Sequence, residues 1–352
     1  MTTGGGDTAP RHPRVPAAIA LGPILHARHR PEDLDRIAAA VPGSRIVLLG
    51  DDGAPDGPLE DAEVLFRGSS LSGDHLDRLL ARAPRVVWIH SASVGVERVL
   101  TPATLERGIT VTNGRGVFSR PIAEYVLMMM LAVRRRLPAL LELQRERTWQ
   151  PLEGGELRDA TVGIVGMGSI GRAVASYATV FGAHVIALRR HPELGIQAPA
   201  DIDEEPLPAP PRAERVFGTS GLPELFAASD FVVLALPVTA GTEALVDDRA
   251  LAAARPGCWL INVARGRLVD EAALLRALRS GPLGGAVLDA FRDEPLPSAS
   301  PFYGLPNVIV TPHTSWSTDR VLSRSVDVFV DNLTRFVRGE PLHNVVDAGA
   351  GY

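Results

Sequence analysis

Three polar side chains lie shortly after apolar runs, where they could do chemistry together. These are Arg265, Glu294 and His313, and each comes within a few residues of a stretch rich in Val, Leu and Ile. Ligands of open α/β sheets bind beyond the carboxyl ends of the strands, so three such segments can meet at one site. A guanidinium can hold an anion, an imidazole can transfer a proton, and a carboxylate can keep that imidazole charged. Together they suit the reduction of a 2-oxo acid, although each alone also fits a core histidine or a surface charge.

Residues 161–171 form the stretch around which the other elements are arranged. A run rich in Val and Ile leads into the pattern Gly166-x-Gly168-x-x-Gly171, and apolar residues then recur at helical spacing. Strand, tight turn and helix in that order are the context in which this pattern binds a dinucleotide. Gly166 permits the turn, Gly168 lets a pyrophosphate approach the backbone, and the start of the helix offers unpaired N–H groups to the phosphates. An ordinary strand-to-helix turn is the alternative.

Two arginines stand where a dinucleotide site commonly carries an acid. In such folds an acidic residue about 20 positions after the first glycine binds the ribose 2′-hydroxyl. The residue 23 positions after Gly166 is Arg189, and Arg190 follows it. Guanidinium groups match the oxygens of a 2′-phosphate and stay charged. We therefore predict NADP(H) as the preferred cofactor, with NAD(H) held by ribose contacts from elsewhere as the alternative.

The composition narrows the classes of partner. A chain of 352 residues suggests about two domains, and a formal charge of −5 gives no electrostatic reason to expect nucleic acid or an anionic membrane. The one cysteine, Cys258, cannot form an intrachain disulfide, and no closely spaced His or Cys set suggests a metal site. No lysine occurs, which excludes Schiff-base chemistry. No apolar run is long enough to span a membrane.

Strand-like runs alternate with helix-like stretches along the chain. Such alternation is typical of parallel sheets covered by helices. The expected strands are 17–21, 46–49, 64–66, 86–90, 110–112, 161–165, 184–188, 231–236, 258–263, 285–289 and 307–310. The clearest helices are expected at 33–41, 74–83, 102–107 and 320–338.

Three further segments have distinct compositions. Residues 1–14 look like a Gly- and Pro-containing tail in preference to a signal peptide, so we expect a cytoplasmic protein. Residues 119–149 resemble one long helix that Pro138 kinks or restarts. Because Tyr125–Leu131 is apolar on all sides, we expect this helix to be buried at a domain or subunit junction, and we expect a homodimer. Between 190 and 230 the Pro and acid content predicts an irregular insertion.

Several motifs in a single order resemble the D-isomer-specific 2-hydroxyacid dehydrogenase family, which includes the glyoxylate/hydroxypyruvate reductases. The similarity runs from about residue 60 to 345 and is carried by residues 116–125, 166–171, 236–239, 262–271, 289–297 and 306–313. The resemblance implies an α/β fold with two Rossmann-like, doubly wound parallel-sheet domains. Its substrate domain would be discontinuous, formed by residues 1–118 and 319–352, while residues 119–318 would bind the dinucleotide.

The same resemblance implies a role for each matching residue. Arg265 would bind the substrate, and Glu294 would pair with His313, the acid/base. Asp289 would hold the nicotinamide amide. The pyrophosphate would contact Ser169 and Ile170. The remaining expected contacts are Leu236, Pro237, Val263 and Ala264 to the cofactor, and Val94 and Gly95 to the substrate.

The departures from the family pattern bear on specificity. Arg189 replaces the usual Asp, and this favours both NADP(H) and the branch that acts on small 2-oxo acids such as glyoxylate or hydroxypyruvate. Selectivity is expected to depend on side chains around Phe66, Arg67, Trp88 and Trp316. A different class, the nucleotide-sensing corepressors of the same fold, is the alternative to an enzyme. Formate dehydrogenases of the superfamily use an amide partner for the histidine, and Glu294 argues against that branch.

Overall fold

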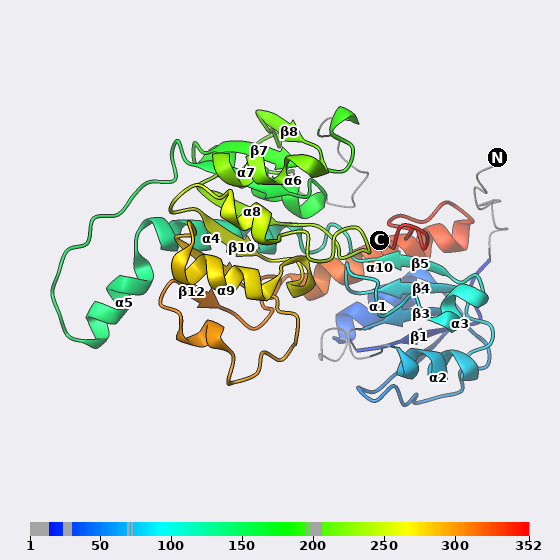
Figure 1. Ribbon diagram of the computed structural model, residues 1–352. Helices are drawn as coiled ribbons and strands as arrows, with labels where there is room; N and C mark the ends of the chain where they lie inside the picture. The colour runs from blue at the N-terminus through cyan, green and yellow to red at the C-terminus, as the bar shows by residue number, and fades with distance from the viewer. Residues whose placement is uncertain are drawn as a thin grey trace. The chain divides into compact units, whose positions relative to one another are not determined.

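The computed structural model describes residues 14–23, 30–68, 71, 73–194, 196 and 206–351. Most of the expected tail at 1–14 and part of the expected insertion therefore lie outside the described residues. Within the described part, the chain divides into unit 1, which runs to Val117 and resumes at Asp319, and unit 2, Phe118–Thr318. Both units have an α/β architecture based on a parallel sheet, which confirms the predicted fold class (Figure 1).

Unit 1 contains a five-stranded sheet with the order β2-β1-β3-β4-β5. Every neighbouring pair of strands is parallel. The order reverses direction beside the first strand, as in a doubly wound sheet. The strands are β1 Ala18–Leu21, β2 Arg45–Leu48, β3 Ala62–Arg67, β4 Trp88–Ser91 and β5 Thr110–Asn113.

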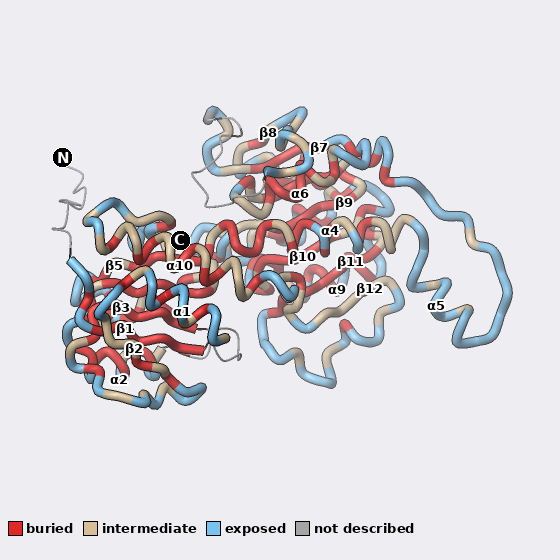
Figure 2. The backbone as a smooth tube through the Cα atoms, turned by 180° about the vertical axis from the view of Figure 1, so that it is seen from behind, coloured by how far each residue is buried: buried red, intermediate tan, exposed pale blue. Residues whose placement is uncertain are grey.

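Helices cover both faces of the unit 1 sheet, so its inner strands β1, β3 and β4 are buried on both sides (Figure 2). Ile19 of β1 packs in one cluster with Ile37 and Phe329, and the next residue, Ala20, packs in the other cluster with Leu76. This alternation follows from the two-residue period of a strand. The helices are α1 Pro31–Ala40 and α10 Val321–Arg338 on the first face, and α2 Asp74–Arg82 and α3 Pro102–Glu106 elsewhere in the unit.

The aromatic cluster in unit 1 corrects one expectation. Phe66 and Trp88 are both 0% exposed, and their ring centroids lie 4.8 and 5.6 Å from that of Phe329. They are core residues, so the prediction that they help to select the substrate is wrong. The strand positions put both side chains on the face that α10 covers, and this pairing with the distant end of the chain has no local signal.

His90 is buried within the same cluster. Its ring centroid lies 5.5 Å from those of Phe66 and Phe329, and its Nδ1 lies 2.8 Å from Thr112 Oγ1. Burial lowers the pKa of His90 to about 3. Between that value and about pH 6.5, the ordinary pKa of histidine, the unfolded chain binds a proton at position 90 whereas the folded state keeps the imidazole neutral.

The free energy of unfolding should consequently fall as the pH is lowered below about 6.5. Only the unfolded state gains a proton at position 90 in this range. His90 should therefore lower the free energy of unfolding by an amount that approaches about 1.4 kcal/mol per pH unit. Urea titrations from pH 7.5 to about 5 measure it. His90→Gln should flatten this dependence, whereas His75→Gln, at an exposed position of α2, should leave it. Equal slopes in the two variants would contradict the assignment.

Unit 2 contains a seven-stranded parallel sheet with the order β12-β11-β10-β9-β6-β7-β8. Two strands lie on one side of β6 and four on the other, so the chain reverses direction at β6, as in dinucleotide-binding sheets. The strands are β6 Thr161–Val165, β7 His184–Leu188, β8 Arg215–Phe217, β9 Phe231–Leu234, β10 Trp259–Asn262, β11 Gly285–Leu288 and β12 Val308–Val310.

The helices of unit 2 bury both faces of this sheet. Val165, Val232 and Leu260 belong to the core cluster that also holds Phe226 of α7 and Leu274 of α9. On the opposite face of the sheet, Gly171 of α6 lies against the strand that precedes it, and α4 packs on α6. The helices are α4 Ser119–Arg134, α5 Leu137–Arg145, α6 Ser169–Val180, α7 Leu222–Ala228, α8 Asp248–Ala252 and α9 Glu271–Ser280. In the part of the chain that the structure describes, no helix is both long enough and apolar enough to cross a membrane.

The segment predicted as one helix over 119–149 is two helices. The backbone leaves the α conformation at Arg136, which has φ of 55°, and Pro138 lies in the first turn of α5. The expected restart at Pro138 is confirmed, but the helix ends at Arg145 and Trp149 lies outside it. The apolar run is only partly buried, because Met130 is covered whereas Met128 is exposed.

The stretch from 190 to 230 is less irregular than predicted. It contains β8 and α7, and β8 pairs in parallel with β7. A strand of three residues is too short to show the period-two pattern, and Pro and acidic residues around it hide the signal. The acidic run at Asp201–Glu205 lies outside the described residues.

Candidate active site

The glycine turn after β6 has the backbone geometry that its sequence predicts. Gly166 has φ of 100°, and a Cβ there would lie 2.4 Å from the carbonyl oxygen of Ala235. A Cβ on Gly171 would lie 2.0 Å from the carbonyl oxygen of Gly166. Among the described residues nothing lies within 4 Å of a Cβ built on Gly168. Two of the glycines are thus required by the protein itself, and the third leaves open space over the turn.

Helix α6 begins directly at this open space. Its N-cap is Gly168, and no side chain caps the helix. The first intrahelical bond runs from the Arg172 N–H to the Gly168 carbonyl, so the N–H groups of Ser169 and Ile170 come before the helical ladder. Amide donors at the positive end of a helix dipole suit a pyrophosphate. The residues present therefore fit a dinucleotide.

Arg189 lies at the neighbouring strand end. The Gly166 N–H donates to the Leu188 carbonyl over 2.9 Å, and the Arg189 N–H donates to the Phe217 carbonyl over 3.0 Å. These bonds place Arg189 between the glycine turn and the end of β8. Arg190 follows and is exposed. Two guanidinium groups therefore follow β7 at the edge where an adenosine ribose lies in dinucleotide folds.

The predicted cofactor-contact residues follow the next two strands of the same sheet. Leu236 and Pro237 come after β9, and Leu236 Cβ would lie 2.9 Å from a Cβ on Gly166. Val263 and Ala264 come after β10 and are 6% and 8% exposed. The structure therefore places all four at the carboxyl edge that carries the glycine turn.

The Asn262 side chain and a close backbone contact brace the loop that carries Arg265. Asn262 Nδ2 donates to the Arg265 carbonyl over 2.9 Å, and Asn262 Oδ1 accepts from the Ala264 N–H over 3.1 Å. Directly after Arg265, a Cβ on Gly266 would lie 1.9 Å from the carbonyl carbon of Phe291. The Arg265 loop and the loop after β11 therefore touch through their backbones, which only a glycine allows.

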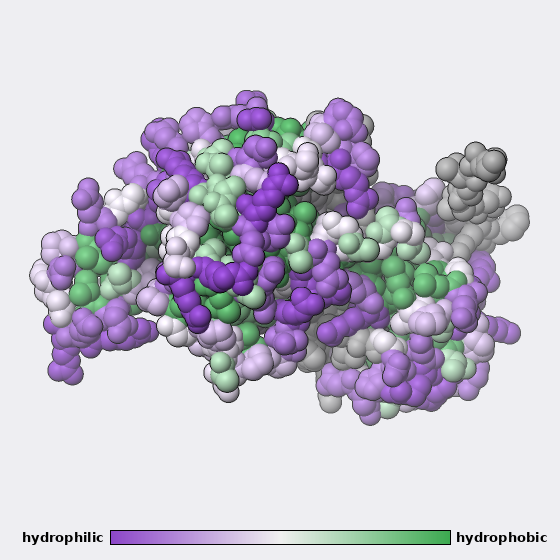
Figure 3. All heavy atoms as spheres, in the orientation of Figure 1, coloured by the Kyte–Doolittle hydropathy of each residue, from purple (hydrophilic) through white to green (hydrophobic). Residues whose placement is uncertain are grey.

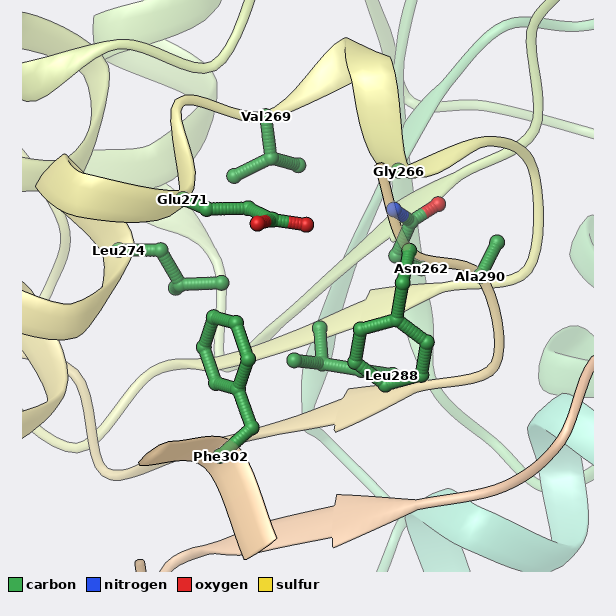
Figure 4. Close-up of a pocket in the computed structure, with 9 residues that line it drawn as sticks. Asn262, Gly266, Val269, Glu271, Leu274, Leu288, Ala290 and Phe302 are labelled. Carbon is green, nitrogen blue, oxygen red and sulfur yellow. The ribbon is translucent and has the colours of Figure 1, made fainter. Parts of the chain in front are cut away.

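A small cavity lies between these two loops and the start of α9 (Figure 4). Its volume is about 10 Å³, room for about one water molecule. The side chain of Glu271 enters it, and Glu271 Oε1 accepts from the Arg292 N–H over 2.9 Å. Glu271 therefore ties α9 to the loop that carries Glu294.

Glu294 and His313 form a direct pair within unit 2. Glu294 Oε2 lies 2.8 Å from His313 Nδ1, and Glu294 Oε1 accepts from the Phe291 N–H over 2.9 Å. Both side chains are about one third exposed, 38% and 34%. With Nδ1 bonded to the carboxylate, Nε2 is the nitrogen available to a ligand.

The two other predicted site residues, His313 and Arg265, both help to lower the pKa of Glu294. Burial alone would raise the pKa of Glu294, but the hydrogen bonds from His313 and the Phe291 N–H outweigh it, and the charges of His313 and Arg265 add to them. The pKa of Glu294 is consequently lowered, and its carboxylate is ionised at neutral pH. Because the Gly266 backbone also touches Phe291, the loops that carry Arg265 and the Glu294–His313 pair lie in one neighbourhood.

Asp289 is fully buried at the end of β11. Its Oδ1 accepts from Thr311 Oγ1 over 2.6 Å and from the Thr314 N–H over 2.8 Å, and its Oδ2 accepts from the Ser315 N–H over 3.0 Å. The carboxylate thus holds the chain on both sides of His313. Its expected contact with a nicotinamide stays a prediction.

Val94 and Gly95, the predicted substrate contacts, follow β4 in unit 1. The Val94 carbonyl accepts from Asn113 Nδ2 over 3.0 Å, and the Gly95 carbonyl accepts from Ser93 Oγ over 2.9 Å. Arg67 is 2% exposed, donates to Ser93 Oγ over 3.4 Å, and has its pKa lowered to about 10, chiefly by burial. This loop is therefore braced, and its role with substrate stays a prediction.

Sequence reasoning missed the polar residues that support these groups. Asn262 and Glu271 lie in a motif already identified, but nothing in the spacing shows that their side chains turn back onto the backbone. Tyr125 and Thr311 contact each other across 186 positions of sequence, a relation without any local signal. Among the described residues, no three His, Cys, Asp or Glu side chains gather as a metal site.

The chain matches a known protein family over most of unit 2. The profile described as "D-isomer specific 2-hydroxyacid dehydrogenase, NAD binding domain" matches residues 127–315. The D-3-phosphoglycerate dehydrogenase of Mycobacterium tuberculosis is 34% identical over 322 residues, 91% of this chain and 54% of that protein. The glyoxylate reductase of Korarchaeum cryptofilum is 32% identical over 301 residues, 82% of this chain and 84% of that protein. This chain spans about half the length of the phosphoglycerate dehydrogenase.

The fold is also similar to solved structures. One is the NADPH-dependent glyoxylate/hydroxypyruvate reductase of Sinorhizobium meliloti in complex with NADP and sulfate, with a TM-score of 0.77 and 28% identity. The superposition covers 95% of this chain and 100% of the other. The likeness therefore includes both units.

Proposed function

Because this chain belongs to the D-isomer specific 2-hydroxyacid dehydrogenase family, we propose that it reduces a small 2-oxo acid to the D-2-hydroxy acid with NADPH. The observation that carries this proposal is the 2.8 Å pair of Glu294 and His313. The pair lies in the same unit as the glycine turn, and the charge of Arg265 helps to lower the pKa of Glu294. Glyoxylate and hydroxypyruvate are the substrates that the relatives' names favour.

The dinucleotide would be held by backbone and apolar contacts at the carboxyl edge of the unit 2 sheet. The N–H groups of Ser169 and Ile170 would donate to the pyrophosphate beside Gly168. Leu236, Pro237, Val263 and Ala264 would line its path towards Asp289, which would hold the nicotinamide amide. When bound, the reduced nicotinamide supplies the hydride that reaches the substrate 2-carbon.

The reduction also requires that the substrate carboxylate is held in place and that one proton is supplied. Arg265 would bind the substrate carboxylate and the carbonyl oxygen, which orients the carbonyl and stabilises charge that develops on its oxygen. His313 Nε2 would donate its proton to that oxygen while the hydride arrives at carbon, which yields the hydroxyl group. Glu294 would stabilise the imidazolium before transfer. Residues 1–118 and 319–352 would supply the substrate domain, with Val94 and Gly95 holding the carboxylate.

NADP(H) is proposed over NAD(H) because of the residues that follow β7. Arg189 and Arg190 replace the acid that binds a ribose 2′-hydroxyl, and two guanidinium groups complement a 2′-phosphate. The Sinorhizobium meliloti structure contains NADP, which supports the proposal. The cytoplasm is the proposed location, as the sequence suggests.

A panel of 2-oxo acids assayed with NADPH and NADH tests this function. Glyoxylate or hydroxypyruvate should be reduced, with kcat/KM at least about tenfold higher for NADPH, since a guanidinium–phosphate contact is worth about 1.4 kcal/mol or more. Turnover of none of the acids by a protein that binds NADPH would favour the corepressor-like alternative. A tenfold preference for NADH would reverse the cofactor assignment.

Glu294→Gln should move the alkaline limit of the reduction to lower pH. An imidazole that has lost its anionic neighbour gives up its proton at lower pH, and reduction requires the protonated form. The displacement is expected because Glu294 Oε2 contacts His313 Nδ1 directly, at 2.8 Å. The pH dependence of kcat measures it. Glu243→Gln, which removes a surface ion pair with Arg267, is the control, and an unmoved limit in Glu294→Gln would contradict the pairing.

We propose that the protein is a homodimer in which a second copy covers α5. No residue of α5 is buried, and the helix projects from the rest of unit 2 (Figure 1). Apolar side chains lie on the surface in this part of the molecule (Figure 3). Leu137, Leu140 and Leu141 are exposed, and Trp149 beyond the helix is 100% exposed. Apolar surface of this kind is commonly covered by another protein. Sedimentation equilibrium should give twice the chain mass of 37.5 kDa, and a concentration-independent monomer would contradict the proposal.

A further inference from the structure

A chain of hydrogen bonds joins helix α4 to the loop that carries His313. The Tyr125 hydroxyl lies 2.6 Å from Thr311 Oγ1, and Thr311 Oγ1 lies 2.6 Å from Asp289 Oδ1. Asp289 then accepts from the N–H groups of Thr314 and Ser315. Two of these residues are fully or almost fully buried: Asp289 is 0% exposed and Tyr125 is 9% exposed.

The direction of each bond follows from the number of protons available. An ionised carboxylate only accepts, so Thr311 must donate its single hydroxyl proton to Asp289. Thr311 Oγ1 therefore accepts from the Tyr125 hydroxyl. Burial raises the pKa of Tyr125 to about 12 against the opposing hydrogen bond with Thr311, and the charge of Asp289 adds to the rise. Tyr125 thus remains a donor at any working pH.

Next to this chain of bonds, His313 has a backbone conformation that is energetically unfavourable for a residue other than glycine. His313 has φ of 51°, in the left-handed region, and its N–H donates to the Thr311 carbonyl over 3.0 Å across Pro312. A residue other than glycine persists in that region only when its surroundings hold it there. Asp289 binds a side chain before His313 and two backbone N–H groups after it, so the carboxylate supplies that restraint.

We propose that Tyr125 and Thr311 are positioning residues that act through Asp289 to hold His313 with Nδ1 on Glu294. The proposal rests on the proposed function, in which His313 donates the proton. The hydroxyl of Thr311 directs Asp289 Oδ1, and Tyr125 fixes the rotation of that hydroxyl. Loss of the Thr311 hydroxyl leaves the buried carboxylate with one partner fewer, whereas loss of the Tyr125 hydroxyl frees the rotation of the Thr311 hydroxyl. Either change loosens the turn at His313.

The test compares Thr311→Val with Thr311→Ser, and Tyr125→Phe with Tyr177→Phe. The valine is nearly isosteric but cannot donate, whereas the serine can. Tyr177 lies on α6, and its hydroxyl bonds to Glu124 over 3.4 Å, outside the chain of bonds that leads to Asp289, which makes it the matched control. For each folded variant we would measure kcat, KM and their pH dependence with glyoxylate and NADPH, and the NADPH dissociation constant.

Thr311→Val should lower kcat about tenfold or more, because small displacements of a reacting group are costly. Its alkaline limit should move to lower pH, as in Glu294→Gln, while NADPH binding stays unchanged. Thr311→Ser should restore most of kcat, Tyr125→Phe should shift both quantities in the same direction as Thr311→Val, and Tyr177→Phe should behave as the wild type. A wild-type kcat and pH limit in Thr311→Val, or equal losses in Thr311→Ser, would overturn the proposal.

A spectroscopic readout separates this proposal from the proposed function. The ¹⁵N resonances of the His313 imidazole, identified among the nine histidines by their loss in His313→Asn, report its hydrogen bonding without any turnover. They should change in Thr311→Val and not in Thr311→Ser. If the wild type reduces no 2-oxo acid, the proposed function fails, yet unchanged resonances in Thr311→Val would still refute the positioning role and changed ones would support it.

Discussion

His313→Asn is expected to lower kcat for 2-oxo acid reduction by about 10²–10⁴-fold, the range that a positioned general acid contributes. In the proposed mechanism the His313 imidazole, bonded to Glu294 over 2.8 Å, is the one side chain that delivers the proton. Asparagine is the replacement of choice because it tolerates the left-handed conformation that His313 adopts, with φ of 51°. The loss should therefore come from the chemistry and leave the turn intact. Steady-state kinetics with saturating NADPH measure it.

Two controls distinguish a lost proton donor from a damaged site. The NADPH dissociation constant of His313→Asn should stay within about twofold of the wild type, a change of roughly 0.4 kcal/mol. His75→Asn, at an exposed position of unit 1, should keep full activity. A kcat of His313→Asn close to that of the wild type would remove this residue from the mechanism.

Arg265→Gln is expected to lower kcat/KM by about 10²–10³-fold, comparable with the loss of one preorganised donor at a developing oxyanion. The guanidinium would bind both the carboxylate and the carbonyl oxygen, so its removal should raise KM and lower kcat together. Arg265→Lys keeps the charge but loses the planar fork, and it should recover only part of the activity. Initial rates over a range of glyoxylate concentrations give both parameters.

A neighbouring arginine provides the matched control. Arg267 lies two positions further on and forms an ion pair with Glu243 at 2.5 Å on the surface. Arg267→Gln should therefore leave kcat/KM nearly unchanged. If Arg265→Gln and Arg267→Gln behave alike, the assigned anion site is wrong.

The local motifs predicted much of the carboxyl edge of unit 2. Gly166 and Gly171 could be recognised because the steric demand of a tight turn between strand and helix leaves glycine as the only choice. A Cβ at either position would lie within 2.4 Å of a backbone carbonyl oxygen. Glu294 and His313 could be expected to pair because the ends of neighbouring parallel strands meet, and β11 and β12 are neighbours.

Other features depended on contacts that no local pattern encodes. Phe66 and Trp88 were expected near the substrate, but α10, from the other end of the chain, covers them in the core. The three-residue strand β8 could not be distinguished from loop because its length is below one full repeat of any pattern. Pro138 indicated that the helix restarts, but the left-handed backbone of Arg136 has no signal in the residue type itself.

The sequence by itself therefore determined the α/β class, the glycine turn and the identity of the three polar groups, since each follows from short-range sterics or from the period of strands and helices. Only the tertiary structure decided how those groups are held. Glu271, Tyr125 and Thr311 act through hydrogen bonds that span from 21 to 186 positions. Long-range bonds of this kind form when separate elements pack together, and a one-dimensional pattern carries no record of which buried donor will meet which acceptor.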